Sequence, residues 1–150
     1  MVKVMASGVF DILHPGHLHF LEEAKKLGDE LVVVVATDKT VRARKHEPMT
    51  PQDMRLRMIA ALRPVDLAVL GHDGDMFRIV EEIRPDIIAL GFDQHHGEDE
   101  IRAEMEKRGL KVEIVRLPQL DHDLTGSRKI MQKVIEWYLA EEQLKRVEGR

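Results

Sequence analysis

Residues 2–20 read VKVMASGVFDILHPGHLHF, and this order predicts a strand, a short loop and the start of a helix. Val2–Ala6 is a short run with the β-branched residues typical of strands. Apolar residues then recur at helical spacing from Leu18 to Leu27, and Gly28 is expected to end the helix. A strand that leads directly into a helix is the repeating unit of alternating α/β folds.

The same alternation continues to the end of the chain. Further strands are predicted at residues 31–36, 65–70, 86–90 and 111–117. Further helices are predicted at residues 50–64, 76–83, 98–108 and about 127–147. Alternation without a linker or an internal repeat predicts a single domain over residues 1–150. Its expected fold is Rossmann-like, a doubly wound α/β sheet of five parallel strands.

The second predicted helix has a recognisable start. Thr50 can cap it, Pro51 suits its first turn, and Asp53 can reach back to the cap. Its expected apolar face consists of Met54, Met58, Ala61 and Leu62. Methionines at helical spacing are expected to fill the core.

Composition excludes several classes of protein. Hydrophobic residues make up 43% and charged residues 33%, which is typical of a folded globular domain. The formal net charge of -4 argues against a nucleic-acid partner, because a phosphate backbone attracts clustered Lys and Arg. The absence of cysteine excludes disulfides, a thiol nucleophile and thiolate metal sites. Leu31–Ala36 is the longest apolar run, far short of the roughly 20 residues that span a bilayer, and the N-terminus does not resemble a signal peptide. We therefore expect a cytoplasmic protein without a membrane partner.

Polar segments follow three of the predicted strands, at residues 7–17, 37–48 and 91–97. In doubly wound sheets, ligands bind beyond the carboxyl ends of the strands, where the strand order reverses. These three segments are therefore expected to form the functional site.

The first of these segments contains two histidines at the predicted helix start. Pro15 and Gly16 turn the chain into the helix, whose free N–H groups and dipole offer an anion site. His14 and His17 are three residues apart, so both rings are expected on one side of the first turn. There they can stabilise the charge that develops when an α-phosphate is attacked. Gly8 would let a ligand approach the backbone. From these residues alone, a merely structural turn and a metal-binding pair remain alternatives.

The ten residues 8–17, GVFDILHPGH, resemble the motif of the nucleotidylyltransferase superfamily of cytidylyltransferases and adenylyltransferases. The likeness extends from Lys3 to about Ile135. Two blocks, residues 85–94 and 123–130, are most similar to archaeal FAD synthases. This resemblance implies that ATP and FMN are the substrates, that AMP is transferred to FMN to give FAD and pyrophosphate, and that a divalent metal, expected to be Mg²⁺, takes part.

The resemblance also implies roles for individual residues. Those placed against ATP are Val9, Phe10, His14, Pro15, Gly16, His17 and Asp93. His14 and His17 are expected to stabilise the pentacoordinate phosphorus, with Arg44 as a helper near the triphosphate. The sequence departs from the pattern at Val9, where the family often has Thr, and at Leu120, where archaeal relatives often have an aromatic residue. The metal ligands are left unknown.

Two alternative functions stay open at this point. Glycerol-3-phosphate cytidylyltransferases typically have Arg-Thr-x-Gly-Ile-Ser-Thr-Thr before the last helix, whereas residues 120–127 here read LDHDLTGS. An acidic loop is a poor clamp for a triphosphate, which disfavours the cytidylyl function. A nucleotide-binding regulatory module without catalysis is the alternative from another class. The two histidines argue against such a module, whereas Val9, which lacks the hydroxyl of the Thr often found there, keeps this alternative open.

Basic residues in two places could serve substrate or structure. Lys39, Arg42, Arg44 and Lys45 form an expected loop that is either a solvated face or a clamp for phosphates. Arg55 and Arg63 lie eight apart on nearly one face of a helix, and each either reaches the site or pairs with an acidic neighbour. The pairs at residues 72–73, 95–96 and 122–123 match no familiar metal-ligand spacing, so surface roles are expected.

The last predicted helix has an apolar side with no obvious partner in the sequence. Thr125 or Ser127 is expected to cap it. Its Trp137, Tyr138 and Leu144 are expected to be exposed. Such a surface favours a homodimer.

Overall fold

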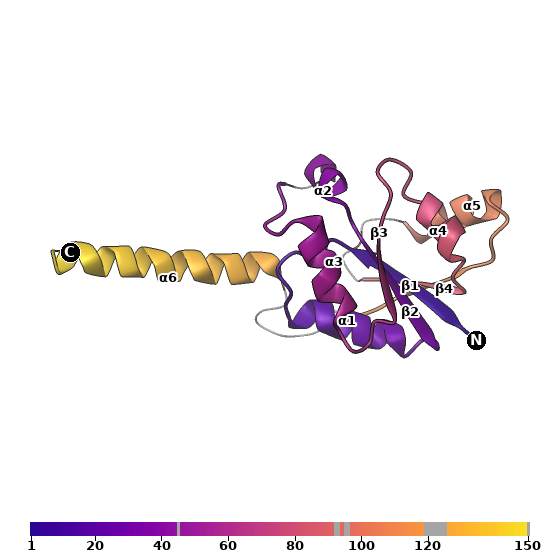
Figure 1. Cartoon of the computed structure of the whole chain (residues 1–150), viewed down its shortest axis with the longest axis horizontal. Helices are drawn as coiled ribbons and strands as arrows, with labels where there is room; N and C mark the ends of the chain where they lie inside the picture. Colours follow the sequence, from indigo (N-terminus) through magenta and orange to yellow (C-terminus); the bar gives the residue numbers. More distant parts are fainter. Residues whose placement is uncertain (45, 92–93, 95–96, 119–125, 150) are drawn as a thin grey trace.

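The computed structural model describes residues 1–44, 46–91, 94, 97–118 and 126–149 of the chain. A parallel sheet forms its centre, with helices packed on the sheet and a long C-terminal helix (Figure 1). The strands are β1 (Lys3–Gly8), β2 (Glu30–Val35), β3 (Leu67–Leu70), β4 (Ile87–Leu90) and β5 (Glu113–Arg116). The helices are α1 (Pro15–Lys25), α2 (Asp38–Arg44), α3 (Gln52–Ala60), α4 (Arg78–Ile83), α5 (Glu98–Lys107) and α6 (Ser127–Val147).

The sheet has the order β3-β2-β1-β4-β5, and all four neighbouring pairs are parallel. The chain builds outward from β1 to β3, then returns to the other side of β1 and builds outward again. Val4 of β1 pairs with Leu31 of β2 on one side and with Ile87 of β4 on the other. The predicted doubly wound sheet of five parallel strands is therefore confirmed, and the strand order reverses between β1 and β4.

Alternate residues of the central strand face two hydrophobic layers. Val4 and Ala6 pack in one cluster with residues of α1 and α3, whereas Met5 packs in the other with residues of α4 and α5. Residues 31–35 of β2 are all buried. A parallel strand covered on both faces has this continuous apolar pattern, because neither face meets water.

The buried face of α3 differs from the predicted one. Arg55 and Ile59, one turn apart, are its buried residues, whereas Met54 and Met58 are about half exposed. Leu62 of the predicted face does pack against the core. The prediction was wrong for the two methionines, because periodicity treats a charged residue as exposed, while this arginine is buried with several hydrogen-bond partners. Among the other methionines, Met105 is buried in the core as predicted.

Three predicted details around helix starts are also corrected. Thr50 does not cap α3, because the N-cap of this helix is Pro51. The Thr50 hydroxyl instead donates a hydrogen bond to Asp11. The N-cap of α6 is Gly126, so Ser127 is the first helical residue, and Thr125 lies outside the described residues. The expected basic loop is in part helix α2, anchored by the buried Val41.

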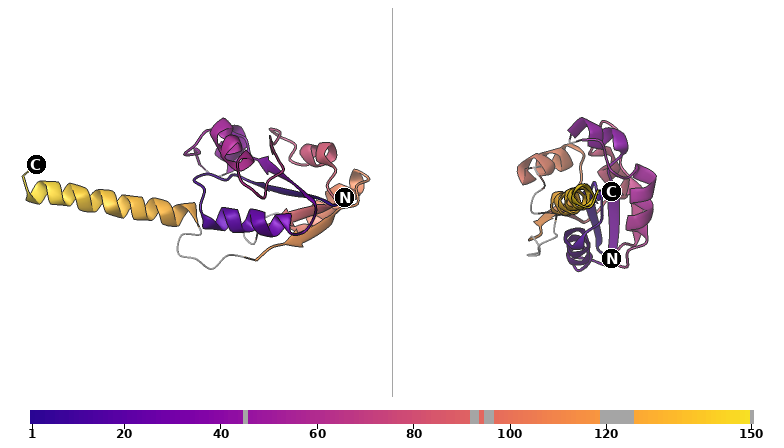
Figure 2. Two further views of the ribbon diagram at one scale, coloured as in Figure 1. Left: turned by 60° about the horizontal axis from the view of Figure 1, so that its bottom comes forward. Right: turned by 90° about the vertical axis from the view of Figure 1, so that its left-hand side faces the viewer.

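Helix α6 extends away from the sheet and the other helices (Figures 1 and 2). Trp137, Tyr138 and Leu144 are each more than half exposed, as predicted. Within the described part of the chain, no helix combines the length and the apolar character needed to cross a membrane.

Candidate active site

The loop after β1 and the first turn of α1 lie where the strand order reverses. Two residues of this loop, Phe10 and Ile12, have left-handed backbones with φ of 55° and 52°. Such values are uncommon for residues with a side chain, above all for a β-branched one. Backbone strain of this kind persists only where the surrounding structure holds it, and it is often found at functional sites.

The Phe10 side chain points into the protein. It is 5% exposed, and a Cβ atom at Gly8 would lie 2.9 Å from its Cζ atom. Gly8 thus makes room for the phenyl ring, and the expected approach of a ligand to its backbone stays a prediction. The same ring meets the His17 imidazole edge-on, with centroids 5.5 Å apart. If Phe10 contacts a nucleotide, its backbone is the part that does so.

His14 and His17 lie side by side, as their spacing predicted. Their rings stack with centroids 3.7 Å apart and planes inclined by 26°. His14 is also the N-cap of α1, since its Nδ1 accepts a hydrogen bond of 3.1 Å from the Gly16 N–H. An accepting Nδ1 requires the neutral ring to carry its proton on Nε2.

The N–H groups at the start of α1 are already paired. The Gly16 N–H donates to His14 Nδ1, and the N–H groups of His17 and Leu18 donate to the His14 carbonyl. Pro15 has no N–H. The expectation of free N–H groups at residues 16–18 of this helix start is therefore corrected.

Arg44 lies at the exposed end of α2. Its Nη2 approaches Met76 Sδ at 3.7 Å, which links α2 to the segment before α4. Arg42, two residues earlier, is paired with Glu47 at 2.8 Å. The part of Arg44 in ATP binding stays a prediction.

Several predicted positions lie outside the described residues, namely Lys45, Asp93, His95, His96 and residues 120–123. Gln94, next to Asp93, is described, and sequence reasoning missed it. Its Nε2 donates to the Ser7 carbonyl at 2.8 Å, and its Oε1 accepts from the Gly91 N–H at 2.9 Å. Gln94 thereby ties the loop after β4 to the end of β1.

Asp11 is a second residue that sequence reasoning left without a role. Its carboxylate, 8% exposed, accepts hydrogen bonds from the N–H groups of Met49 and Thr50 and from the Thr50 hydroxyl. Desolvation raises the pKa of Asp11, but these hydrogen bonds outweigh it, so the pKa lies below its ordinary value. The loop after β1 is thereby attached to the segment before α3.

Arg55 is the third residue of this network. It is 1% exposed and pairs with Asp38 at 2.8 Å. Of the two alternatives that the sequence left open, pairing with an acidic neighbour is therefore confirmed. Desolvation raises the pKa of Asp38, yet the hydrogen bond from Arg55 and its charge help to hold that pKa below the ordinary value.

Residues 5–145 match the family model described as "Cytidylyltransferase-like". The chain belongs to this family. It is 59% identical over 137 residues to a protein named FAD synthase from Aciduliprofundum boonei, covering 91% of this chain and 92% of that one. It is 53% identical over 135 residues to the FAD synthase of Methanoculleus marisnigri, covering 90% of each chain. The superfamily resemblance seen in the sequence is thus confirmed.

A solved structure has the same fold. It is a protein from Thermoplasma volcanium described as a lipopolysaccharide core biosynthesis protein, with a TM-score of 0.80 and 53% identity. The match covers 81% of this chain and 99% of that one.

Across the described ranges, no group of three or more His, Asp or Glu side chains is arranged to hold a metal ion. The carboxylate of Asp11 already accepts three hydrogen bonds, and Asp38 is paired with Arg55. His72 pairs with Glu82 at 2.9 Å, and Asp73 accepts a hydrogen bond from Thr37.

Proposed function

We propose that this chain is an FAD synthase, which transfers the AMP part of ATP to FMN and releases pyrophosphate. The observation that carries the proposal is a stacked histidine pair at the reversal of a nucleotidylyltransferase sheet, in a chain 59% identical to a named FAD synthase. In this reaction an FMN phosphate oxygen forms a bond to the α-phosphorus of ATP. The bond from that phosphorus to the bridging oxygen breaks, and pyrophosphate leaves.

The reaction asks the protein for positioning and charge stabilisation rather than for covalent chemistry. We assign both to the histidine pair. Nε2 of His14 carries the proton when Nδ1 caps the helix, so Nε2 is the atom that we propose donates to an α-phosphate oxygen. His17, stacked on the same side, would donate to a second oxygen or to the leaving group.

The other ATP contacts belong to the same proposal. Val9 and Phe10 would contribute backbone groups, since the Phe10 ring is buried. Arg44 would approach the triphosphate from the end of α2, and Asp93 would contact the nucleotide from beyond β4. Pro15 and Gly16 would shape the turn that presents the rings.

A divalent metal would come with the substrate. Mg²⁺ is commonly held by one or two carboxylates together with phosphate oxygens, and it neutralises charge on the leaving pyrophosphate. The described carboxylates nearest the loop are committed to Thr50, Met49 and Arg55, so they do not fit a ready protein cage. We therefore propose that Mg²⁺ enters bound to ATP. We also propose that the reaction takes place in the cytoplasm.

The test is a direct assay of the full chain. Purified protein is incubated with Mg²⁺, ATP or CTP, and FMN, riboflavin or glycerol 3-phosphate, and both pyrophosphate and the nucleotide product are measured. We expect FAD from ATP with FMN and no product from riboflavin, which lacks the attacking phosphate. Faster turnover of CTP with glycerol 3-phosphate would reassign the chain to that activity. ATP binding without pyrophosphate from any pair would favour a regulatory module.

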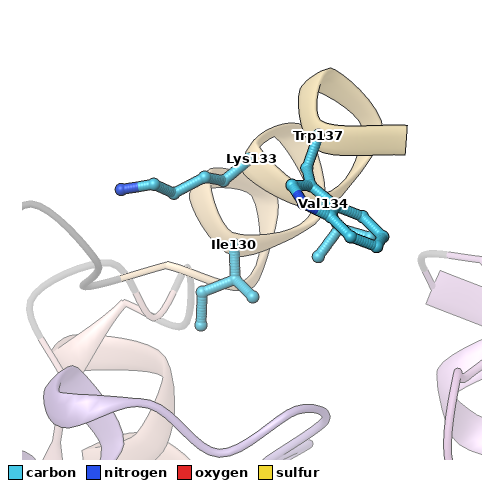
Figure 3. Close-up of a pocket in the computed structure, with 4 residues that line it drawn as sticks. All are labelled: Ile130, Lys133, Val134 and Trp137. Atoms are coloured by element: carbon cyan, nitrogen blue, oxygen red, sulfur yellow. The ribbon is translucent and has the colours of Figure 1, made fainter. Parts of the chain in front are cut away.

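We also propose that two copies associate through α6. Ile130, Val134 and Trp137 form an apolar surface beside Lys133 (Figure 3). Val134 and Trp137 are each more than half exposed, and a second copy would cover them. An antiparallel pairing centred on Trp137 would place Lys133 beside Glu141 of a second copy, where the two charges attract.

A further inference from the structure

We propose that Arg55 is a positioning residue that holds the loop after β1 and the start of α2 at one fixed separation, so that the histidine pair and Arg44 face the same nucleotide. The assignment deepens the proposed adenylyl transfer and rests on it. Arg55 itself is buried and would not touch substrate.

One guanidinium joins four segments of the chain. Nη1 donates to the carbonyls of Val9 and Ala36, at 2.8 and 2.7 Å. Nε donates to the carbonyl of Thr50 at 3.0 Å, and Nη2 donates to Asp38 at 2.8 Å. These acceptors lie just past the ends of β1 and β2, before α3, and at the start of α2. A planar guanidinium with several fixed donors can hold such an arrangement, whereas no other side chain can.

Stability alone does not require an arginine at this position. Replacing a buried ion pair by apolar residues of similar volume is often neutral or even stabilising, because desolvation of the charges is avoided. Arg55 lies one turn from the buried Ile59 on a helix face that packs against the sheet. A charge in that place is better explained by the geometry that its donors impose.

The loop after β1 is a segment that needs such anchors. Its Phe10 and Ile12 have left-handed backbones, a strained state that requires outside support. Arg55 holds the loop at Val9, and Asp11 holds it through Met49 and Thr50. The two anchored residues, Val9 and Asp11, flank Phe10 in the sequence.

From Phe10 the constraint continues to the histidines. The Phe10 ring contacts the His17 ring, which stacks on His14. On the other side, Arg55 holds Ala36 and Asp38, which begin the helix that ends at Arg44. Removing the guanidinium should therefore free both sides of the proposed nucleotide site together, namely the loop that leads to the histidines and the helix that ends at Arg44.

Four variants test this role. Arg55→Met keeps length and much of the volume but removes every donor, while Arg55→Lys keeps the charge and part of the donor set. Arg57→Met, an exposed position on the same helix, is the matched control for losing a cation. Ile59→Ala removes buried packing one turn away but none of the hydrogen bonds that Arg55 makes, and it controls for lost stability.

Kinetics, ATP binding and hydrogen exchange are measured at a temperature where each variant is folded by circular dichroism, and the Tm is measured separately. For Arg55→Met we expect turnover to fall by about 10²-fold, the order of loss caused by a misplaced site. We expect KM for ATP and the directly measured Kd for ATP to rise, while KM for FMN changes little. Hydrogen exchange should quicken at residues 9–13 and 36–40, and Arg55→Lys should recover part of each effect. Arg57→Met should match the wild type, and Ile59→Ala should lower only the Tm.

Two results would overturn the proposal. One is an Arg55→Met protein with wild-type ATP affinity and unchanged exchange in those two segments. The other is an Ile59→Ala protein whose Tm equals that of Arg55→Met and whose turnover falls by the same factor. Such a result would show that the role of Arg55 is purely structural. If Arg55→Met does not fold, Arg55→Lys and Asp38→Asn carry the same measurements. A wild-type chain that makes no FAD would refute the proposed function, whereas ATP affinity and exchange would still test Arg55.

Discussion

The two imidazoles at the start of α1 combine a structural task with a proposed catalytic one. His14 caps the helix through Nδ1, and the His17 ring makes a T-shaped contact with the Phe10 ring. A simple truncation of His14 would therefore remove both a cap and a proton donor, and the two effects have to be separated. Asn is among the residues that cap helices best, so it can replace the cap without replacing the imidazole.

We expect His14→Asn and His17→Ala to lower kcat by ~10²–10³, the usual effect of losing a group that stabilises transition-state charge. His14→Asn should keep the wild-type Tm, whereas His14→Ala should lose about 1 kcal/mol of stability with its cap. Because both rings act on one phosphoryl group, the double variant should be little worse than the poorer single one. Stopped assays with parallel melting curves measure this, and near-normal kcat in either single variant would contradict the mechanism.

The carboxyl of Asp11 makes stability depend on pH. Its pKa is lowered in the folded protein, so its contribution is present above the unfolded value near 3.8 and is lost as the pH falls through the lower folded value. We expect the urea midpoint to drop in that acid range, and Asp11→Asn to flatten the drop while lowering stability at pH 7. Midpoints at pH 7 and pH 3 for both proteins measure the effect. Parallel pH profiles would show that Asp11 contributes nothing to it.

At the scale of elements, α2 turns a run of cations into an ordered surface. Asp38 lies in its first turn, and Arg42 and Arg44 lie in its last, an order that suits the helix dipole. Pairing with Glu47 engages Arg42 beside the helix, whereas Arg44 reaches toward Met76 before α4. Cations on one short helix therefore have different surroundings.

This difference leads to a prediction for the phosphate clamp. Arg44→Ala should raise KM for ATP or lower kcat clearly, because Arg44 is the cation that we place near the triphosphate. Lys39→Ala, at an exposed position on the same helix, is the matched control and should stay near the wild type. Steady-state kinetics with ATP varied at saturating FMN give the comparison. Equal, near-normal constants for both variants would make α2 a solvated face.

At the scale of the whole molecule, a compact sheet carries a projecting helix (Figure 2). The first half of α6 has its apolar residues on one broad side, and Trp137 is 64% exposed. Monomers rarely leave a continuous apolar surface of this kind in water. Contact with a second copy would bury this apolar surface.

We expect the wild-type chain to have twice its 17.2 kDa monomer mass in light scattering after gel filtration. Trp137→Ser should shift the protein toward the monomer, because it removes the largest apolar side chain of the surface. Gln143→Ser, exposed on the same helix, should not change the mass. A wild-type protein that is monomeric at every concentration tested would refute the dimer.

The order of the amino acids is enough to predict the class of fold and the position of the histidine pair. Both follow from short-range patterns: the alternation of apolar runs predicts the sheet, and a spacing of three residues places two rings on one side of a helix turn. The end of β1 as the expected ligand site follows from the same alternation. Exposure of the α6 side chains also followed from local composition.

The residues that support this site are brought together by contacts between distant parts of the chain. Arg55 and Val9 are 46 residues apart, and Asp11 reaches its partners across 38 and 39 residues. The buried face of α3 depends on these contacts, because a charged side chain can enter a core only where distant carbonyls and a carboxylate meet it. Local periodicity cannot anticipate such partners, so it placed Met54 and Met58 in the interior where the folded chain placed Arg55.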